Sequence, residues 1–390
     1  MHMTVTTKRK PLAPLTALRF FAALAILVHH CNGLFWPAAA LGPLDAGVSF
    51  FFVLSGFILT YVYRDAGPIA LRHFYRARIA RIWPLHLCCL LLAILLLTIP
   101  EPFNLGVLAA NALMLHAWIP LDRYFFSYNY ASWSISTELF FYLAFPFLVT
   151  CGRPALWRVL LLSLGMVLAI DLYCHWQHLL PWDVTRDRLS STGLLYSDPL
   201  ARLPEFVAGL LAGAWFLDRR VADHQPLARW TVIELGAIGV FIAGFVYFRD
   251  LATLLAHRLM VTLEGAGVSL AQGFDAALAA PPGLPVRAVG LEWMRHVGLA
   301  PFAVLLIVVF AHQRGAVSRW LAQPWMVFLG EASFAVYLVH QVALRFVQQH
   351  FTRFGLVGFA LYTAAVMAIA CALHLLVEKP ARALLARSGG

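Results

Sequence analysis

Apolar residues fill long stretches of the chain, and short polar segments separate these stretches. A helix needs about 20 mostly apolar residues to cross the hydrocarbon core of a membrane. The pattern therefore predicts an all-α fold, a polytopic transmembrane helix bundle formed by a single domain over residues 1–390. The candidate membrane segments are 14–35, 47–63, 83–99, 105–119, 133–150, 156–174, 199–217, 230–248, 299–313, 324–348 and 355–377.

Lys and Arg gather in alternate loops, and this distribution predicts the topology, because basic loops stay in the cytoplasm. If every candidate segment crossed, the two basic ends of the chain would lie on opposite sides. The positions of Lys and Arg first disagree with the sides that full crossings would give after segment 105–119, which is short. We therefore expect this segment to be irregular or re-entrant, with about ten spanning helices. The arm 1–13 and the tail 379–390 are then both cytoplasmic, as in a multi-pass membrane protein.

Composition narrows the class of protein. Hydrophobic residues make up 61% of the chain, charged residues make up 12%, and the net charge is +10. Soluble proteins carry about 25% charged residues, so this composition excludes an ordinary soluble globule and a disordered chain. The basic residues are spread between apolar runs rather than clustered on a solvated face, which excludes nucleic acid as a partner. The six cysteines form no CxxC pair, and no metal site is predicted.

Two ionisable residues lie inside the first apolar segment. Arg19 and His30 are eleven positions apart, which places them on one helix face about 16 Å apart. Ionisable residues at membrane depth are costly and point to function. The alternative is a structural histidine that hydrogen bonds to a neighbour.

Two further segments carry polar residues at a similar expected depth. Glu138 and Tyr142 share a helix face one turn apart, and they follow Trp133 and Ser134. Ser333, Tyr337 and His340 form one stripe on a later helix. Under the predicted topology His30, Glu138 and His340 all lie in the outer half of the membrane. A histidine oriented by a carboxylate is the arrangement that removes a proton from a hydroxyl. An interfacial belt of aromatic residues is the alternative for 133–142.

The segment 73–84 contains Arg76, Arg78 and Arg81 and is expected in the cytoplasm. Arg78 and Arg81 would point the same way if this loop were helical. Clustered guanidinium groups bind phosphates through paired hydrogen bonds, so the segment is a candidate phosphate site. A role in topology or in contact with anionic lipid is the alternative.

Seven stretches, in order along nearly the whole chain, resemble motifs of the acyltransferase-3 family of bacterial integral membrane acyltransferases. They are 18–30, 47–57, 76–84, 133–142, 202–209, 333–340 and 377–380. The family's basic-residue-x10-His motif falls on Arg19 and His30, and its RxxR motif falls on Arg78 and Arg81.

This resemblance implies O-acetyltransferase activity, with acetyl-CoA as the acyl-donor co-substrate. The implied acceptor is a hydroxyl of a sugar, an exopolysaccharide, a glycolipid or a macrolide. Some members carry an extra hydrolase-like domain after the last helix, and we expect none here because the chain ends at Gly390. Polysaccharide-assembly proteins and membrane lipid are candidate partners.

The residues combine into one mechanistic hypothesis. His30 removes the acceptor proton as general base, with Glu138 orienting it. The donor-binding residues are Arg19, Arg76, Arg78 and Arg81. The substrate or oxyanion candidates are Trp133, Ser134, Tyr142, Tyr337 and His340. Direct transfer and a relay through an acyl-His30 both fit the sequence.

Two other classes of protein also place ionisable groups in a membrane bundle. A proton-coupled transporter would use them as a proton path, although the halves of this chain show no internal repeat. A structural partner in a polysaccharide-export complex would give no reason for three such residues to share a depth. Transfer of acetyl from acetyl-CoA by the purified protein separates both classes from an enzyme.

Overall fold

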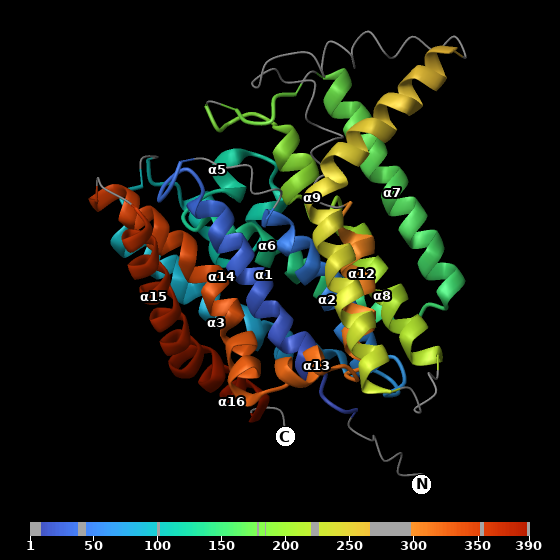
Figure 1. Ribbon diagram of the computed structural model, residues 1–390. Coiled ribbons are helices and arrows are strands. Elements are labelled where there is room, and N and C mark those ends of the chain that lie inside the picture. The colour runs from blue at the N-terminus through green and yellow to red at the C-terminus, as the bar shows by residue number, and fades with distance from the viewer. Residues whose placement is uncertain are drawn as a thin grey trace.

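The computed structural model describes residues 9–37, 44–99, 102–177, 179–183, 185–219, 226–265, 298–351 and 355–387. Part of the predicted arm 1–13, part of the predicted tail 379–390 and residues 266–297 lie outside these ranges. The described residues form helices and no β-strand, and the helices pack into one bundle (Figure 1). This confirms the prediction of an all-α membrane bundle.

Ten helices coincide with the predicted spanning segments other than 105–119. They are α1 (Ala13–Cys31), α2 (Gly47–Tyr63), α3 (Leu71–Leu96), α6 (Trp133–Leu148), α7 (Arg153–Trp176), α8 (Leu203–Asp218), α9 (Leu227–Gly265), α12 (Ala300–Ala311), α14 (Pro324–His350) and α15 (Leu356–Leu373). Among the described residues, seven helices are long and apolar enough to cross a membrane. The remaining three, α6, α8 and α12, have 16, 16 and 12 residues.

Segment 105–119 does not form a long helix. Its first part is α4 (Leu105–Ala112), of 8 residues, and a single 3-10 turn follows at His116–Trp118. At about 1.5 Å per residue α4 is far too short to cross a membrane. The chain continues through α5 (Asp122–Phe125) before it enters α6. The irregular segment thus lies where the charge pattern requires one.

The arginine-bearing segment 73–84 is helical rather than a loop. α3 begins at Leu71, twelve residues before the predicted apolar segment, and continues through Pro84 to Leu96. Arg78 and Arg81 therefore lie on a rigid element. The helix starts this early because Phe74 and Ala80 are buried against the bundle, which anchors its first turns.

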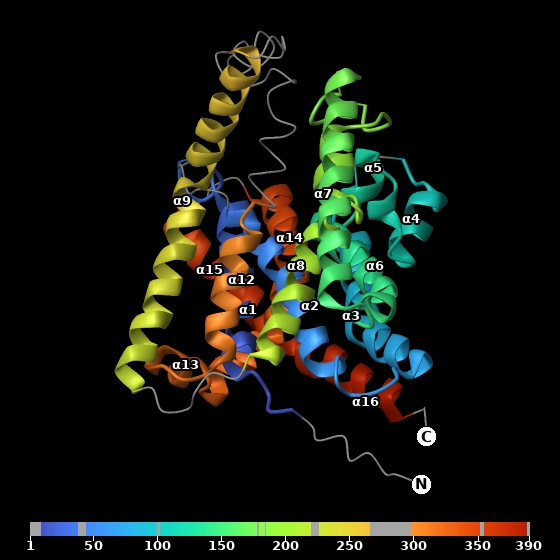
Figure 2. The same ribbon diagram turned by 90° about the vertical axis from the view of Figure 1, so that its right-hand side faces the viewer.

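Both ends of the described chain lie at the same end of the bundle. α1 begins there, and α16 (Lys379–Arg387) and α13 (Ala316–Leu321) lie there as well (Figure 2). α3, α7, α9 and α14 also begin at this end, which therefore carries the basic loops. We call it the basic end, and α5 lies toward the opposite end (Figure 2). That the basic end faces the cytoplasm stays a prediction.

Close helix packing fixes the bundle at two interfaces. A Cβ added at Gly209 of α8 would lie 2.1 Å from the Val53 carbonyl oxygen of α2, and one at Gly56 would lie 2.2 Å from the Phe206 oxygen. A Cβ at Gly330 of α14 would lie 2.0 Å from the Thr16 oxygen of α1. Small residues permit such backbone contact between helices in membranes. α1 and α14 both begin at the basic end, so they run in parallel.

The α2–α8 contact gives a stability prediction. Gly209→Ala would place a methyl group against backbone atoms that cannot move away, so the two helices would have to separate. We expect the free energy of unfolding to fall by about 1–3 kcal/mol, the usual effect of overpacking. Thermal denaturation in detergent measures this. Gly165→Ala is the matched control, because no atom lies within 4 Å of its added Cβ. Equal melting temperatures for the two variants would contradict the prediction.

Candidate active site

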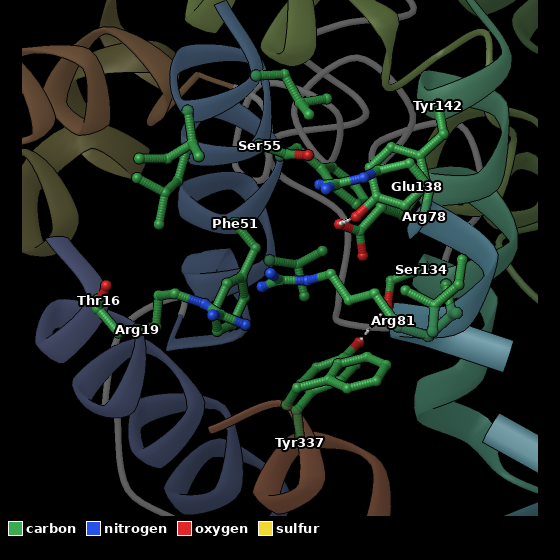
Figure 3. Close-up of a pocket in the computed structure, with 18 of the residues that line it drawn as sticks. Thr16, Arg19, Phe51, Ser55, Arg78, Arg81, Ser134, Glu138, Tyr142 and Tyr337 are labelled. Carbon is green, nitrogen blue, oxygen red and sulfur yellow. Dashed lines mark hydrogen bonds between the residues drawn. The ribbon is translucent and has the colours of Figure 1, made fainter. Parts of the chain in front are cut away.

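A cavity of about 170 Å³ lies between α1, α2, α3, α6 and α14 (Figure 3). We call it the arginine cavity. Its charged lining residues are Arg19, Arg78, Arg81 and Glu138. Three guanidinium groups face one carboxylate, so the cavity carries an excess of positive charge. Uncompensated charge at membrane depth is costly, and an anionic ligand would offset that cost.

The arginines reach the cavity from two helices. Arg19 extends from α1 and Arg81 from α3, and their guanidinium groups point toward one another (Figure 3). Arg78, one turn before Arg81, lies over the Tyr142 ring at 5.8 Å and over the Phe74 ring at 5.7 Å. These contacts fix the direction of the Arg78 side chain. Two arginines three residues apart on a helix can therefore serve one ligand together.

The fourth predicted donor residue, Arg76, does not line this cavity. An α-helix turns by about 100° per residue, so Arg76, two residues before Arg78, points to another side of α3. Sequence analysis did not single out Arg382, which the structure brings near the cavity. Arg382 of α16 forms an ion pair with Glu378 and interacts electrostatically with Arg81. The motif 377–380, just before Arg382 in the chain, is the sequence feature that could have pointed to this region.

Hydroxyl groups also line the cavity, from α6 and α14. Tyr142 donates a hydrogen bond to the Glu138 carboxylate. The hydroxyl groups of Ser134 and Tyr337 are 2.8 Å apart, and each also lies within hydrogen-bond distance of the Ala131 carbonyl oxygen, at 3.1 and 3.0 Å. Because one carbonyl accepts from both, either hydroxyl can turn its proton toward a ligand while the other keeps this bond.

His30 and His340 form a pair beyond Tyr337. The Nε2 atom of His340 is 3.2 Å from the Nδ1 atom of His30, and the ring centroids are 5.1 Å apart. The parallel packing of α1 against α14 brings the two rings together. The ring centroids of His340 and Tyr337 are 5.8 Å apart, and Tyr337 lines the arginine cavity, so Tyr337 lies where the histidine pair meets the cavity.

Backbone carbonyls determine which ring nitrogens of the pair carry protons. The Nδ1 atom of His340 is 2.6 Å from the Tyr337 carbonyl oxygen, and a carbonyl only accepts, so this nitrogen carries the proton. The Nε2 atom of His340 is then an acceptor. His30 Nδ1 lies 2.9 Å from the Ile26 carbonyl oxygen and donates toward that oxygen and toward His340. No described residue bonds to the Nε2 atom of His30, so this nitrogen keeps a free lone pair.

The structure separates two residues that the sequence analysis paired. Glu138 is bonded to Tyr142 among the arginines, whereas the hydrogen-bond partners of the His30 ring are His340 and Ile26. The periodicity of each helix could not reveal this, because it depends on which faces of α1, α6 and α14 meet.

Trp133 is buried and lies outside the cavity lining. It packs against Tyr196, with ring centroids 4.5 Å apart.

A buried ion pair supports this wall of the site, and sequence analysis gave it no role. Arg202 and Glu205 are 1% and 0% exposed, and their closest atoms are 2.9 Å apart. The Arg202 guanidinium also lies over the rings of Phe52 and Trp133, at 5.3 and 5.7 Å. Removing one partner of a buried pair leaves a single buried charge, which is costly. We therefore regard the pair as structural: it holds Trp133 and the start of α6 in position.

Comparison with known proteins identifies the family. Residues 13–375 match the Acyltransferase domain family Acyl_transf_3. The chain belongs to this acyltransferase-3 family. No solved structure matches the chain. Among the described residues there is also no group of three or more His, Cys, Asp or Glu side chains that could hold a metal ion.

Two similar proteins illustrate the range of the family. The chain is 28% identical to the acyltransferase MdmB of Streptomyces mycarofaciens, over 96% of this chain and 93% of MdmB. It is 24% identical to the O-acetyltransferase OatA of Staphylococcus aureus, over 87% of this chain and 51% of OatA. The match thus spans about half the length of OatA. Together with the apolar helices, the family identifies a multi-pass membrane acyltransferase.

Proposed function

We propose that the chain transfers an acetyl group from acetyl-CoA to a hydroxyl of a sugar, an exopolysaccharide or another surface glycan. One observation carries the proposal. The positively charged arginine cavity adjoins a histidine with a free nitrogen lone pair, and two hydroxyl groups lie between them. An anionic donor and a base for the acceptor are what acyl transfer from a coenzyme A thioester requires.

The arginines would bind the phosphates of acetyl-CoA. Arg78 and Arg81 lie in the first turns of α3, near the basic end, and Arg19 lies opposite them across the cavity. Planar guanidinium groups bind phosphate oxygens in pairs, which also orients the ligand. The basic end then faces the cytoplasm, where acetyl-CoA is made. Both termini would lie on that side of an inner membrane.

His30 would act as the general base through its Nε2 atom. This nitrogen takes the proton from the acceptor hydroxyl, and the hydroxyl oxygen bonds to the thioester carbon. The carbon–sulfur bond then breaks. Coenzyme A leaves as a thiolate, and the proton stays on His30. His340 orients His30, since its Nε2 atom accepts from His30 Nδ1. The relay route, in which His30 itself carries the acetyl group, uses the same nitrogen.

Ser134 and Tyr337 would stabilise the oxyanion that develops on the thioester oxygen. Their hydroxyl groups are already positioned by the shared contact with Ala131, so little reorganisation is needed during the reaction. Glu138 would keep Tyr142 in place and partly neutralise the arginines. This role differs from the orientation of His30 that the sequence suggested.

A direct assay tests the proposal. Purified protein in detergent should bind acetyl-CoA, and the bacterium that carries the gene should lose acetyl groups from a surface glycan when the gene is deleted. Calorimetry and mass spectrometry measure the two outcomes. A protein that binds no acetyl-CoA but moves protons in sealed vesicles would instead be a transporter.

A further inference from the structure

A second, larger cavity lies toward the opposite end of the bundle, and the mechanism above does not use it. Its volume is about 530 Å³. The end of α3, the start of α4, and the segments around Tyr128 and Arg186 form its walls. We call it the opposite cavity. Because α3 starts at the basic end, its C-terminal end lies away from the arginine cavity (Figure 2).

The lining of the opposite cavity has an apolar and a polar side. Ile94, Phe103 and Val107 belong to the apolar side, and Phe103 is 75% exposed. Asn104 and Ser127 belong to the polar side, together with charged groups. A pyranose ring has apolar faces and a rim of hydroxyl groups, so it suits a cavity with both kinds of wall.

Charged side chains of both signs face this cavity. The Nη1 atom of Arg123 is 2.7 Å from the Oδ1 atom of Asp187, and both side chains remain partly exposed, at 36% and 54%. Such a pair offers hydrogen-bond donors and acceptors side by side, which is what neighbouring hydroxyl groups need. Arg186 adds a second guanidinium group. Burial and the neighbouring Arg345 lower the pKa of Arg186.

Backbone strain marks the same cavity. Tyr128 has φ of 51° and Arg186 has φ of 62°, so both bulky residues adopt the left-handed conformation that favours glycine. Each such residue costs about 1–3 kcal/mol, and such strain gathers at ligand sites. Arg186 also donates hydrogen bonds to the carbonyl oxygens of Asp122 and Phe126, at 3.1 and 2.8 Å. These bonds hold the two strained segments together.

The wall of the opposite cavity is bonded to the part of α14 that carries His340. The Asn129 amide donates to the Leu338 carbonyl oxygen at 2.8 Å, and Arg345 donates to the Tyr128 carbonyl oxygen at 2.6 Å. His340 lies between these two contacts on the helix, and Val342 packs in one apolar cluster with Tyr128. The step from His340 to Arg345 is about 7.5 Å along the helix axis.

We infer that the opposite cavity is the acceptor site and that it binds a saccharide unit. This inference rests on the proposed function, because it assigns the hydroxyl that His30 deprotonates. Acetyl-CoA would enter from the basic end and the saccharide from the opposite end. Arg123 and Asp187 would hold hydroxyl groups of the sugar, and Phe103 would cover one face of its ring.

The double variant Arg123→Ala with Asp187→Ala tests this inference without leaving a single charge behind. Each variant gene is returned to a deletion strain of the bacterium that carries it. Acetate released by base from the purified cell-surface glycan measures transfer in the cell. Calorimetry with acetyl-CoA measures the donor site of the purified protein. We expect glycan acetylation to fall about tenfold or more, because charge-assisted hydrogen bonds are lost, while acetyl-CoA affinity stays unchanged.

Two further variants distinguish sugar binding from a merely structural ion pair. The exchange Arg123→Asp with Asp187→Arg keeps the pair but reverses its donors and acceptors, so we expect acetylation to stay low. The double variant Arg153→Ala with Asp218→Ala removes a comparable exposed pair at the basic end, 3.2 Å apart, and should have no effect.

Three results with these variants would overturn the inference. They are unchanged acetylation in the first variant, restored acetylation in the exchange, and a loss of acetyl-CoA affinity that matches the loss of acetylation. Gene-dependent acetylation found on a secreted small molecule, with none on the glycan, would exclude a saccharide acceptor. If deletion of the gene alters no acetylation and the wild-type protein binds no acetyl-CoA, the proposed function fails instead.

Discussion

Replacing His30 with alanine is expected to reduce acetyl transfer by about 10²–10⁴-fold, the usual contribution of a general base. The side chain reaches no arginine of the cavity, so the variant should still bind acetyl-CoA with unchanged affinity. Transfer of radiolabelled acetyl to the glycan, together with calorimetry of acetyl-CoA, measures the two effects. The relay route predicts the same loss, and it also predicts that mass spectrometry detects an acetylated His30 in the wild-type protein.

His29→Ala is the matched control for this prediction. His29 is the adjacent residue on α1, but it lies near Asp45, with 3.9 Å between Nδ1 and Oδ1. About 100° of helix rotation separates it from His30. We expect the control to retain acetyl transfer. If both variants lose transfer equally, or if His30→Ala keeps it, the assignment of the base is wrong.

The double variant Arg78→Ala with Arg81→Ala is expected to weaken acetyl-CoA binding by about 100-fold or more. Each guanidinium that leaves a phosphate removes a charge-assisted hydrogen bond worth about 1.5–3 kcal/mol. Acetyl-pantetheine has no nucleotide phosphates, so the activity of the variant with this shorter donor should match that of the wild type. Comparing the two donors thus isolates the phosphate contacts from any damage to the catalytic step.

Arg72→Ala is the control on the same helix. Arg72 is exposed in the first turn of α3, outside the lining of the arginine cavity. Arg72 carries the same charge near the basic end. If the arginines only set the membrane topology, its removal would lower activity as much as removal of Arg78 and Arg81. Similar losses in Arg72→Ala and in the double variant would favour that alternative, and so would equal losses with both donors.

The bundle could be predicted because each of its helices follows from local sequence. Apolar runs gave the positions of the helices, and the charge pattern indicated that 105–119 would be irregular, where α4 has only 8 residues. The early start of α3 at Leu71 could not be read from hydropathy, because charged residues occupy its first turns. Burial of Phe74 and Ala80 against the bundle extends the helix there.

Some features of the candidate site also follow from local sequence, and others depend on how the helices pack. The spacing of Arg78 and Arg81 on one helix is local, and both residues line one cavity. The contact between His30 and His340 joins residues 310 positions apart and depends on the parallel packing of α1 and α14. The bond from Tyr142 to Glu138 is local as well, but the direction of Glu138 relative to His30 is set by three helices together. The buried pair of Arg202 and Glu205 depends likewise on tertiary packing.

The arrangement of the two cavities along α14 has a consequence for how the substrates meet. One cavity adjoins Tyr337 near the basic end, and the other is bonded to the same helix through Leu338 and Arg345. If the coenzyme and the acceptor bind in these two cavities and enter from opposite ends, they need not compete, and either can bind first. Free coenzyme A would return to the side from which it came. The acetylated product would leave on the other side, so a cytoplasmic thioester could modify a molecule that never enters the cytoplasm.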